Sequence, residues 1–365
     1  MSMLGYARTS GILYPGSLMS SSDVTCLCQD QYGYIWIGTT YGLNRFDGYR
    51  FYSYRHNSSD TGSLPQNDVC SLFCDSEGHL WVGTGNAISK YDFTRNRFVQ
   101  IPFPGNIHPR VNSIMESKRG DILIGTAGTG VFVVRKGSDK IVAESRLMQL
   151  VKDNFLSRLF EDSDGYLWCK GRFDDFYRID YQNGQATKAK KFSLSLGPLQ
   201  QFLTDSSNRL LAVFPKRIMR FEKTDEIWKD AGLSTESIVG EVDMSSAMLS
   251  KQGCLYIGTT GNGVYTFPKG QSAPQSIDFS DKFFQLSESS TTALMEDRSG
   301  NVWTGCFRKG VVLLNHQQNA FRSWTFSPLN GSLSNAQISS MAIDDNGRIW
   351  CTVWNKGLYR FNGKG

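Results

Sequence analysis

The sequence lacks the features that would assign it to several common functional classes. It has no run of 18 apolar residues, so no transmembrane helix is expected. Residues 1–20 show no basic start followed by an apolar stretch, so no signal peptide is visible. Like charges do not form blocks, and a formal net charge of +5 is too small to indicate binding to nucleic acid.

Metal-binding and catalytic patterns are also scarce. The four histidines are dispersed without an H-x-x-x-H spacing, and no two cysteines have the C-x-x-C spacing of a zinc or redox site. The histidines are His56, His79, His108 and His316, and the cysteines are Cys26, Cys28, Cys70, Cys74, Cys169, Cys254, Cys306 and Cys351. We predict that the cysteines are small buried side chains, while a disulfide between neighbouring strands remains open. No metal and no cofactor is expected.

What the sequence does contain is a repeat. Residues 30–46, D-Q-Y-G-Y-I-W-I-G-T-T-Y-G-L-N-R-F, return in degraded form every 42–47 residues. The eight copies align on one glycine slot: Gly33, Gly78, Gly120, Gly165, Asn208, Gly253, Gly300 and Gly347. A period of roughly 40–50 residues built from short β-type runs is typical of a β-propeller, in which each repeat forms one four-stranded sheet. We therefore predict an all-β fold, a β-propeller of four-stranded blades, in which only residues 144–152 favour a helix.

Two further slots of the repeat have structural explanations. Six copies carry Asp three residues before the glycine slot, and Asp-x-x-Gly between apolar runs predicts a tight turn with a left-handed glycine. Five copies carry tryptophan in the next strand: Trp36, Trp81, Trp168, Trp303 and Trp350. A feature that most blades share cannot mark one asymmetric ligand site, so we interpret these residues as turn and packing elements.

Several segments resemble a known family. They are W-I-G-T-T-Y-G-L-N-R-F-D at residues 36–47, W-V-G-T at 81–84, and the linkers S-L-P-Q-N-D-V at 63–69 and G-S-L-S-N-A-Q-I at 331–338. Together they resemble the propeller repeats of bacterial hybrid two-component sensor histidine kinases of the Bacteroidetes type. The resemblance spans about residues 20–362 and is weakest in the fifth copy, 205–221.

The resemblance carries expectations about the whole protein. It implies a seven-bladed propeller in the periplasmic half of an exported sensor, where two propellers usually precede a β-sandwich, a membrane helix, a kinase and a DNA-binding regulator. It also implies an oligosaccharide ligand and a homodimer formed through those downstream domains. Kinase activity would lie outside this chain.

The number of blades stays open. The expected domains are an N-terminal segment, residues 1–23, with a possible ring-closing strand, and a propeller over residues 24–365. The resemblance favours seven blades with one copy left over. Counting favours eight, with residues 1–23 supplying the fourth strand that the last copy lacks. We expect all eight copies to join one ring, because a leftover three-stranded sheet would expose its edges and an apolar face.

A ligand site is expected on the loops that join the second and third strands of the blades. These loops vary most between copies, and function in propellers usually lies on such loops. Aromatic faces stack on sugar rings, and Arg or Lys binds carboxylate or sulfate. The candidate residues are Tyr41, Arg172, Phe173, Arg217, Phe307, Arg308, Trp354 and Lys356. In a ring of eight, Tyr41, Phe307, Arg308, Trp354 and Lys356 would converge.

Three functions compete on these grounds. A periplasmic, glycan-responsive sensor agrees with the resemblance. A protein-interaction scaffold without a small ligand needs only an exposed patch. A propeller lyase or glycosidase needs a base on the loops, and none of the four histidines falls there, so we expect no enzyme activity.

Overall fold

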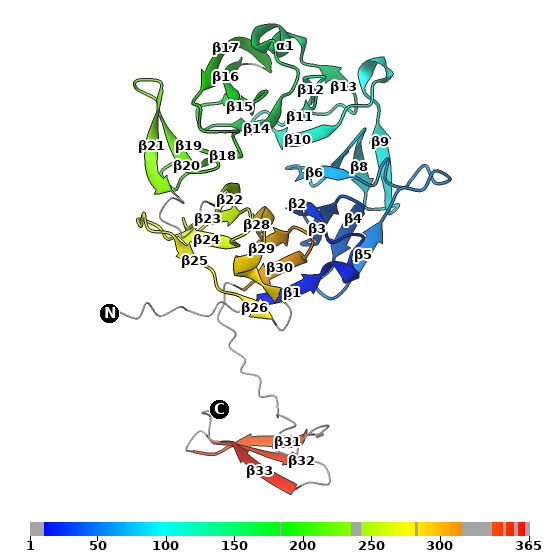
Figure 1. The fold of residues 1–365 in the computed structure, drawn as a ribbon. Helices are drawn as coiled ribbons and strands as arrows, with labels where there is room; N and C mark the ends of the chain where they lie inside the picture. Colours follow the sequence, from blue (N-terminus) through cyan, green and yellow to red (C-terminus); the bar gives the residue numbers. More distant parts are fainter. Residues whose placement is uncertain are drawn as a thin grey trace. The chain divides into compact units, whose positions relative to one another are not determined.

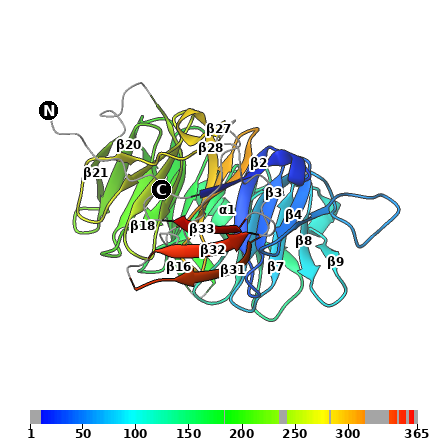
Figure 2. The same cartoon turned by 90° about the horizontal axis from the view of Figure 1, so that it is seen from below.

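The chain forms two units, residues 1–316 and residues 317–365. The structure, a computed structural model, describes residues 11–182, 184–234, 242–281, 284–315, 338–345, 348–353 and 357–361. Unit 1 contains seven sheets of four antiparallel strands arranged around an axis (Figure 1). Figure 2 views this ring edge-on, with the strands running from one face to the other. The all-β propeller predicted from the repeat is confirmed.

The seven blades of unit 1 follow the order of the repeats. Blade 1 contains β2 (Val24–Gln29), β3 (Ile35–Thr39), β4 (Gly42–Phe46) and β5 (Phe51–Tyr54). Blade 2 contains β6 (Val69–Cys74), β7 (Leu80–Thr84), β8 (Ile88–Asp92) and β9 (Arg97–Ile101). Blade 3 contains β10 (Val111–Glu116), β11 (Ile122–Thr126), β12 (Val131–Val134) and β13 (Ile141–Ala143). Blade 4 contains β14 (Ser157–Glu161), β15 (Tyr166–Lys170), β16 (Asp175–Gln182) and β17 (Gln185–Ser193).

The remaining blades complete the ring. Blade 5 contains β18 (Gln201–Thr204), β19 (Leu210–Val213), β20 (Arg217–Glu222) and β21 (Ile227–Ser234). Blade 6 contains β22 (Met244–Leu249), β23 (Leu255–Thr259), β24 (Val264–Phe267) and β25 (Gln275–Ser276). Blade 7 contains β28 (Thr291–Glu296), β29 (Val302–Cys306), β30 (Gly310–Leu314) and β1 (Gly11–Pro15).

Short elements lie between the blades. β26 (Ser280–Asp281) and β27 (Phe284–Gln285) form a small two-stranded sheet. The 3-10 helices are η1 (Gly16–Leu18), η2 (Pro104–Asn106) and η3 (Leu286–Glu288). The α-helix α1 (Ser145–Val151) lies within residues 144–152, the one stretch that the sequence offered as a helix candidate.

The hydrophobic core of unit 1 consists of seven clusters, one at each junction between adjacent blades. The cluster that joins blade 7 to blade 1 unites Trp303, Val311 and Leu313 with Val24 and Ile37. None of the seven clusters contains a described residue beyond Leu314. The ring therefore closes with seven blades.

The strand β1 completes blade 7. It pairs antiparallel with β30, so that Gly11 lies opposite Leu314 and Tyr14 opposite Val311. The expectation that all eight copies join one ring was wrong, and so was the idea that residues 1–23 supply the fourth strand of the eighth copy. The segment instead pairs with β30 and completes the seventh copy. The ring closes at this point, because the inner strands of blades 7 and 1 pack together.

Unit 2 holds the eighth copy. Its strands β31 (Ile338–Ile343), β32 (Ile349–Val353) and β33 (Gly357–Phe361) form a three-stranded antiparallel sheet. Met341, Ile343 and Leu358 are exposed on it.

The turn that joins the first two strands of each blade has the predicted geometry. The glycine-slot residues of unit 1 all have positive φ, from 62° at Asn208 to 92° at Gly33. In blade 4 the Asp162 carboxylate accepts the backbone N–H groups of Asp164 and Tyr166, both at 3.0 Å. A side chain at this position therefore holds the turn closed.

The same carboxylate also binds the tryptophan of its blade. The indole Nε1 donates to the second Asp oxygen at 2.7–3.0 Å in all five copies that carry tryptophan. Where tryptophan is absent, the partner changes: in blade 5 Arg209 Nε donates to Asp205 at 2.7 Å. Trp36, Trp81 and Trp168 are almost completely buried, which confirms that this slot serves packing.

Hydrogen bonds between blades repeat around the ring. In four blades the last residue of the inner strand accepts a backbone N–H from the turn of the preceding blade. The acceptors are Glu116, Glu161, Glu296 and Gln29, and the donors are Ser76, Lys118, Lys251 and Arg298. The pair of Arg298 and Gln29, at 2.8 Å, fastens blade 7 to blade 1.

Candidate functional site: the loop face and the axial channel

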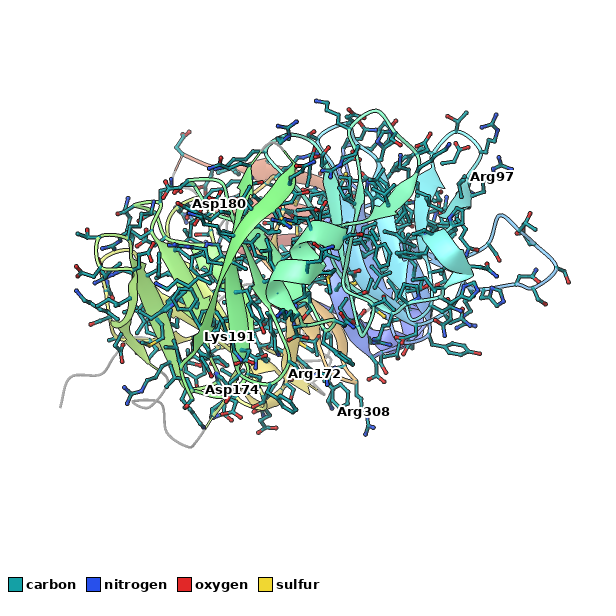
Figure 3. The ribbon with its side chains drawn as sticks, turned by 90° about the horizontal axis from the view of Figure 1, so that it is seen from above. Arg97, Arg172, Asp174, Asp180, Lys191 and Arg308 are labelled. Carbon is teal, nitrogen blue, oxygen red and sulfur yellow. The ribbon has the colours of Figure 1, made fainter. Side chains whose placement is uncertain are left out.

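The connections between second and third strands share one face of unit 1, which we call the loop face. In five blades the residue that follows the second strand donates its N–H to a carbonyl just before the inner strand, at 2.8–3.1 Å. Figure 3 shows Arg172, Asp174 and Arg308 on this face and Asp180 on the opposite one. We call the opposite face, which carries the Asp-x-x-Gly turns, the turn face.

Blades 7 and 1 place two exposed aromatic rings on the loop face. Tyr41 is 55% exposed and Phe307 is 46% exposed. Each ring has an arginine over it: Arg55 lies 5.2 Å from the Tyr41 centroid, and Arg308 lies 5.0 Å from the Phe307 centroid. Because blades 7 and 1 are neighbours, these two pairs lie on adjacent blades. Sequence reasoning missed Arg55, which follows β5 and is distant from Tyr41 in sequence.

Blade 4 carries a third such pair on the opposite side of the ring. Arg172 lies 4.2 Å from the centroid of Phe155, and its backbone N–H donates to Asp153 Oδ2 at 2.7 Å. The neighbouring Phe173 is 80% exposed and has a positive φ of 54°. In blade 5, Arg217 forms an ion pair with Asp230 of the outer strand at 3.2 Å.

The candidate residues therefore fall into separate groups. Tyr41, Phe307 and Arg308 lie on two neighbouring blades, whereas Arg172 and Phe173 lie three blades away and Arg217 lies on blade 5. Trp354 and Lys356 lie outside the described residues, in unit 2. The convergence expected for Tyr41, Phe307, Arg308, Trp354 and Lys356 assumed a ring of eight, in which the eighth copy separates blades 7 and 1. In the ring of seven those blades touch directly.

An axial channel of about 610 Å³ runs between the inner strands. All seven inner strands contribute to its wall. In six blades the inner strand has a β-bulge near its start, at the loop-face end of the strand. The residues at these bulges line the channel: Thr25, Cys70, Asn112, Arg158, Ser245 and Thr292. A bulge adds one residue and re-aims its side chain, which explains this polar ring.

Two of these bulge residues bond neighbouring strands of the channel wall. Thr25 Oγ1 donates to the Val69 carbonyl at 2.6 Å, and Ser245 Oγ donates to the Thr291 carbonyl at 2.5 Å. Each bond joins neighbouring inner strands. Arg158 differs, because it is the one charged residue among the described residues that line the channel. Sequence reasoning missed it, although the aligned bulge positions contrast one arginine with small polar residues.

The cysteines and histidines give no second site. All eight cysteines are free, and within the described ranges no three His, Cys, Asp or Glu side chains are arranged to hold a metal ion. Burial raises the pKa of the Cys70 thiol to about 12. His56 Nδ1 lies 2.7 Å from the Leu64 carbonyl, and His79 Nδ1 lies 3.1 Å from Asp75 Oδ2. None of the histidines in the described part of the chain lines the channel.

Comparison with known proteins relates these repeats to a family. The description "Two component regulator propeller" matches residues 18–41 and 63–86, which cover the first two copies up to the ends of their second strands. Two of the eight copies thus match the two-component regulator propeller repeat. A curated relative, histidine kinase P4 of Formosa agariphila, is 46% identical over 46 residues, which is 13% of this chain and 3% of that protein.

Solved structures share the fold of these two-component regulator propeller repeats over nearly the whole chain. The extracellular domain of the hybrid two-component system BT3049 from B. thetaiotaomicron matches with a TM-score of 0.73 and 20% identity, covering 97% of this chain and 48% of that one. The extracellular domain of BT4673 from the same organism matches with a TM-score of 0.70 and 19% identity, covering 97% of this chain and 46% of that one. This chain thus spans about half the length of those structures.

A propeller enzyme has a similar fold. The virginiamycin B lyase of Staphylococcus aureus matches with a TM-score of 0.64 and 12% identity, covering 84% of this chain and 99% of the lyase. Identities this low describe the fold alone. Within the described ranges, no helix has the length and apolar character needed to cross a membrane.

Proposed function

We propose that this chain is a sensor region of a hybrid two-component system, located outside the cytoplasm, that binds a glycan on its loop face. The observation that carries the proposal is the likeness to the two extracellular domains from B. thetaiotaomicron over 97% of the chain, together with the matched repeats. The kinase that such a sensor would control is separate from these propeller repeats.

The loop face has suitable chemistry for a glycan. Exposed aromatic rings stack on the apolar faces of sugars, and arginine side chains bind hydroxyl, carboxylate and sulfate oxygens. The pairs of Tyr41 with Arg55 and of Phe307 with Arg308 offer both chemistries on adjacent blades. We propose these four residues as the principal sugar-contacting group. Arg172 and Phe173 form a second, separate group, and roles for Arg217, Trp354 and Lys356 stay predictions.

Signalling would follow from differential binding. A ligand shifts an equilibrium only when it binds one arrangement more tightly than another. We propose that occupation of the loop face favours one arrangement of the two chains in a homodimer, which downstream domains then report. The aromatic rings and arginines assigned to the loop face offer stacking and hydrogen bonding to a ligand, so we propose binding and not catalysis.

Mutation of the two loop-face rings tests the proposal. We expect the double variant Tyr41→Ala, Phe307→Ala to bind any recognised oligosaccharide about tenfold or more weakly, since each lost ring contact is worth about 1 kcal/mol. The matched control is Tyr49→Ala, which removes a 91% exposed ring from the β4–β5 connection on the turn face. Isothermal titration with a panel of neutral and acidic oligosaccharides measures the difference.

Two results count against the proposal. Equal loss in the Tyr49 variant would place the ligand elsewhere. Absence of binding to the whole panel, combined with capture of a defined protein partner that depends on Tyr41 and Phe307, would favour the interaction scaffold instead.

A further inference from the structure

Arg158 occupies an unusual position in the wall of the axial channel. It lies at the bulge of the inner strand of blade 4, with a positive φ of 51°. The bulge residues of the other blades, such as Thr25 and Ser245, do not have this left-handed conformation, which side chains other than glycine rarely adopt. The backbone of blade 4 is therefore specialised at the point where it presents a guanidinium group to the channel.

Among the described residues, no acidic side chain pairs with this guanidinium. The guanidinium group of Arg158 forms no hydrogen bond or ion pair with any described residue. Desolvation by the surrounding inner strands lowers the pKa of Arg158 although its side chain is exposed, and the Cys26 thiol acts on it in the opposite direction. Burial raises the pKa of Cys26 itself to about 12, so that thiol is neutral at neutral pH and cannot balance the charge.

A second positive charge, that of Lys170, adds to the imbalance. Lys170, at the end of β15, has its pKa lowered by burial and then by the charge of Arg158, while Asp174 acts in the opposite direction. The Arg158 side chain is nevertheless exposed, and because it lines the channel its guanidinium group is accessible there to an anion that enters. The loop-face end of the channel at blade 4 is therefore positively charged and unoccupied by any acidic side chain among the described residues that line it.

We propose that the axial channel binds the carboxylate or sulfate group of an acidic glycan, with Arg158 as its counter-ion. The inference rests on the proposed function for the sugar, whereas the anion site depends only on Arg158 and the channel. The planar guanidinium fork matches a carboxylate or sulfate with two parallel hydrogen bonds.

The channel has room and further donors for such a group. Its volume of about 610 Å³ is within the range of small-molecule sites, about 300–1,000 Å³. Gln201 Oε1 accepts the Ala247 N–H at 3.2 Å, which leaves its amino group available to the channel. The Asn112 amide lies at the neighbouring bulge of blade 3. Because the bulges lie at the loop-face end, a sugar on the loop face can direct its acidic group inward.

The test compares an acidic and a neutral sugar on the full chain. D-glucuronate, D-glucose and inorganic sulfate are titrated at constant ionic strength into the wild type, Arg158→Gln and Arg97→Gln. Arg97 is an exposed arginine on the outer strand of blade 2 and serves as the matched control (Figure 3). We expect the wild type and Arg97→Gln to bind glucuronate at least tenfold more tightly than glucose, and Arg158→Gln to lose that preference and its sulfate binding.

The outcomes separate this inference from the proposed function. Retention of the preference by Arg158→Gln, or its absence from the wild type, overturns the anion site, while neutral oligosaccharide binding that depends on Tyr41 and Phe307 still stands. Loss of sulfate binding in Arg158→Gln without any glycan binding supports the anion site alone. If Arg158→Gln does not fold, Arg158→Lys is used in its place. We expect its preference for glucuronate over glucose to be several-fold weaker than that of the wild type. An unchanged preference contradicts the inference.

A second measurement needs no sugar. Because the Arg158 side chain is exposed to the channel, we expect Arg158→Gln to unfold at about the same temperature as the wild type in the absence of anions. Sulfate is expected to raise the unfolding temperature of the wild type and to leave that of Arg158→Gln unchanged. If Arg158→Gln unfolds at a lower temperature than the wild type without sulfate, the guanidinium group stabilises the channel wall, and this result would contradict a role in ligand binding.

Discussion

At the level of single residues, the turn aspartate makes two contacts, one within the turn and one with the tryptophan, which appear in the sequence as unrelated positions of the repeat. One oxygen closes the Asp-x-x-Gly turn, and the other binds the indole of the next strand. The turn was predictable, because Asp and Gly at this spacing have a local effect. The indole bond was not, because it depends on the strand returning past the carboxylate. Arg158 was missed for a similar reason, since a one-residue bulge is hidden by the natural variation in repeat length.

Replacing this aspartate tests its double role. We expect Asp162→Ala to lower the free energy of unfolding by about 3 kcal/mol, because it leaves the buried Trp168 indole and two turn N–H groups without an acceptor. The control is Asp164→Ala in the same turn, where the half-exposed carboxylate pairs with Lys223 at 2.6 Å and its loss should cost less than about 1 kcal/mol. Urea denaturation followed by tryptophan fluorescence measures both. Equal effects would contradict the assigned role.

At the level of elements, long hairpins tie blades 4 and 5 together near the rim. Glu226, in the β20–β21 connection, binds Lys190 of β17 at 2.7 Å and Arg178 of β16 at 2.5 Å. These bonds, with Lys190 first and Arg178 second, lower the pKa of Glu226 to about 2. The carboxylate is therefore charged across the range in which most glutamates titrate.

This shift gives a pH-dependent prediction. A depressed pKa in the folded state stabilises the protein above the unfolded pKa of about 4.5, and the contribution is lost as the pH falls toward 2. We expect Glu226→Gln to have a lower urea midpoint than the wild type at pH 7 and the difference to shrink steadily below pH 4.5. A difference that stays constant from pH 7 to pH 3 would show that Glu226 acts through something other than its charge.

The ring-closing strand β1 is the element whose pairing partner was hardest to predict from the sequence. Its run of residues 11–14 fits beside the third strand of any blade, so local pattern alone cannot choose between β30 and β33. The choice depends on packing between blades 7 and 1. Tyr14 supplies that packing, with its ring 4.9 Å from Phe46, 5.3 Å from Phe51 and 5.9 Å from Trp303.

Truncation of this side chain tests the closure. We expect Tyr14→Ala to destabilise unit 1 by about 2–3 kcal/mol, since it removes a half-buried ring from contacts with both blades. Ile12→Ala, on the same strand but 45% exposed, should cost less than about 1 kcal/mol. Hydrogen exchange should also speed up along β30 in Tyr14→Ala. Unchanged exchange at Val312, the partner of Leu13, would argue that β1 does not close the ring in solution.

At the scale of the whole molecule, the hydrophobic core lies in seven interfaces between adjacent blades. The blades differ from one another in their loops and in the residues that line the channel. The repeat predicted the architecture because each copy places a turn, a buried strand and a large packing residue in the same slots. It did not predict which loops meet, because that depends on the number of blades. The sequence also did not distinguish Arg158 from its polar counterparts, since only the channel makes its isolation visible.

The central claim is that residues up to 316 form a complete ring of seven blades that does not need the eighth copy. The most direct measurement compares the thermal unfolding of the full chain with that of a chain ending at residue 316. We predict one cooperative transition for the shorter chain, within about 3 °C of the ring transition in the full chain, because no core cluster of described residues extends past Leu314. A shorter chain that unfolds at a much lower temperature, or fails to fold, would contradict the seven-bladed ring.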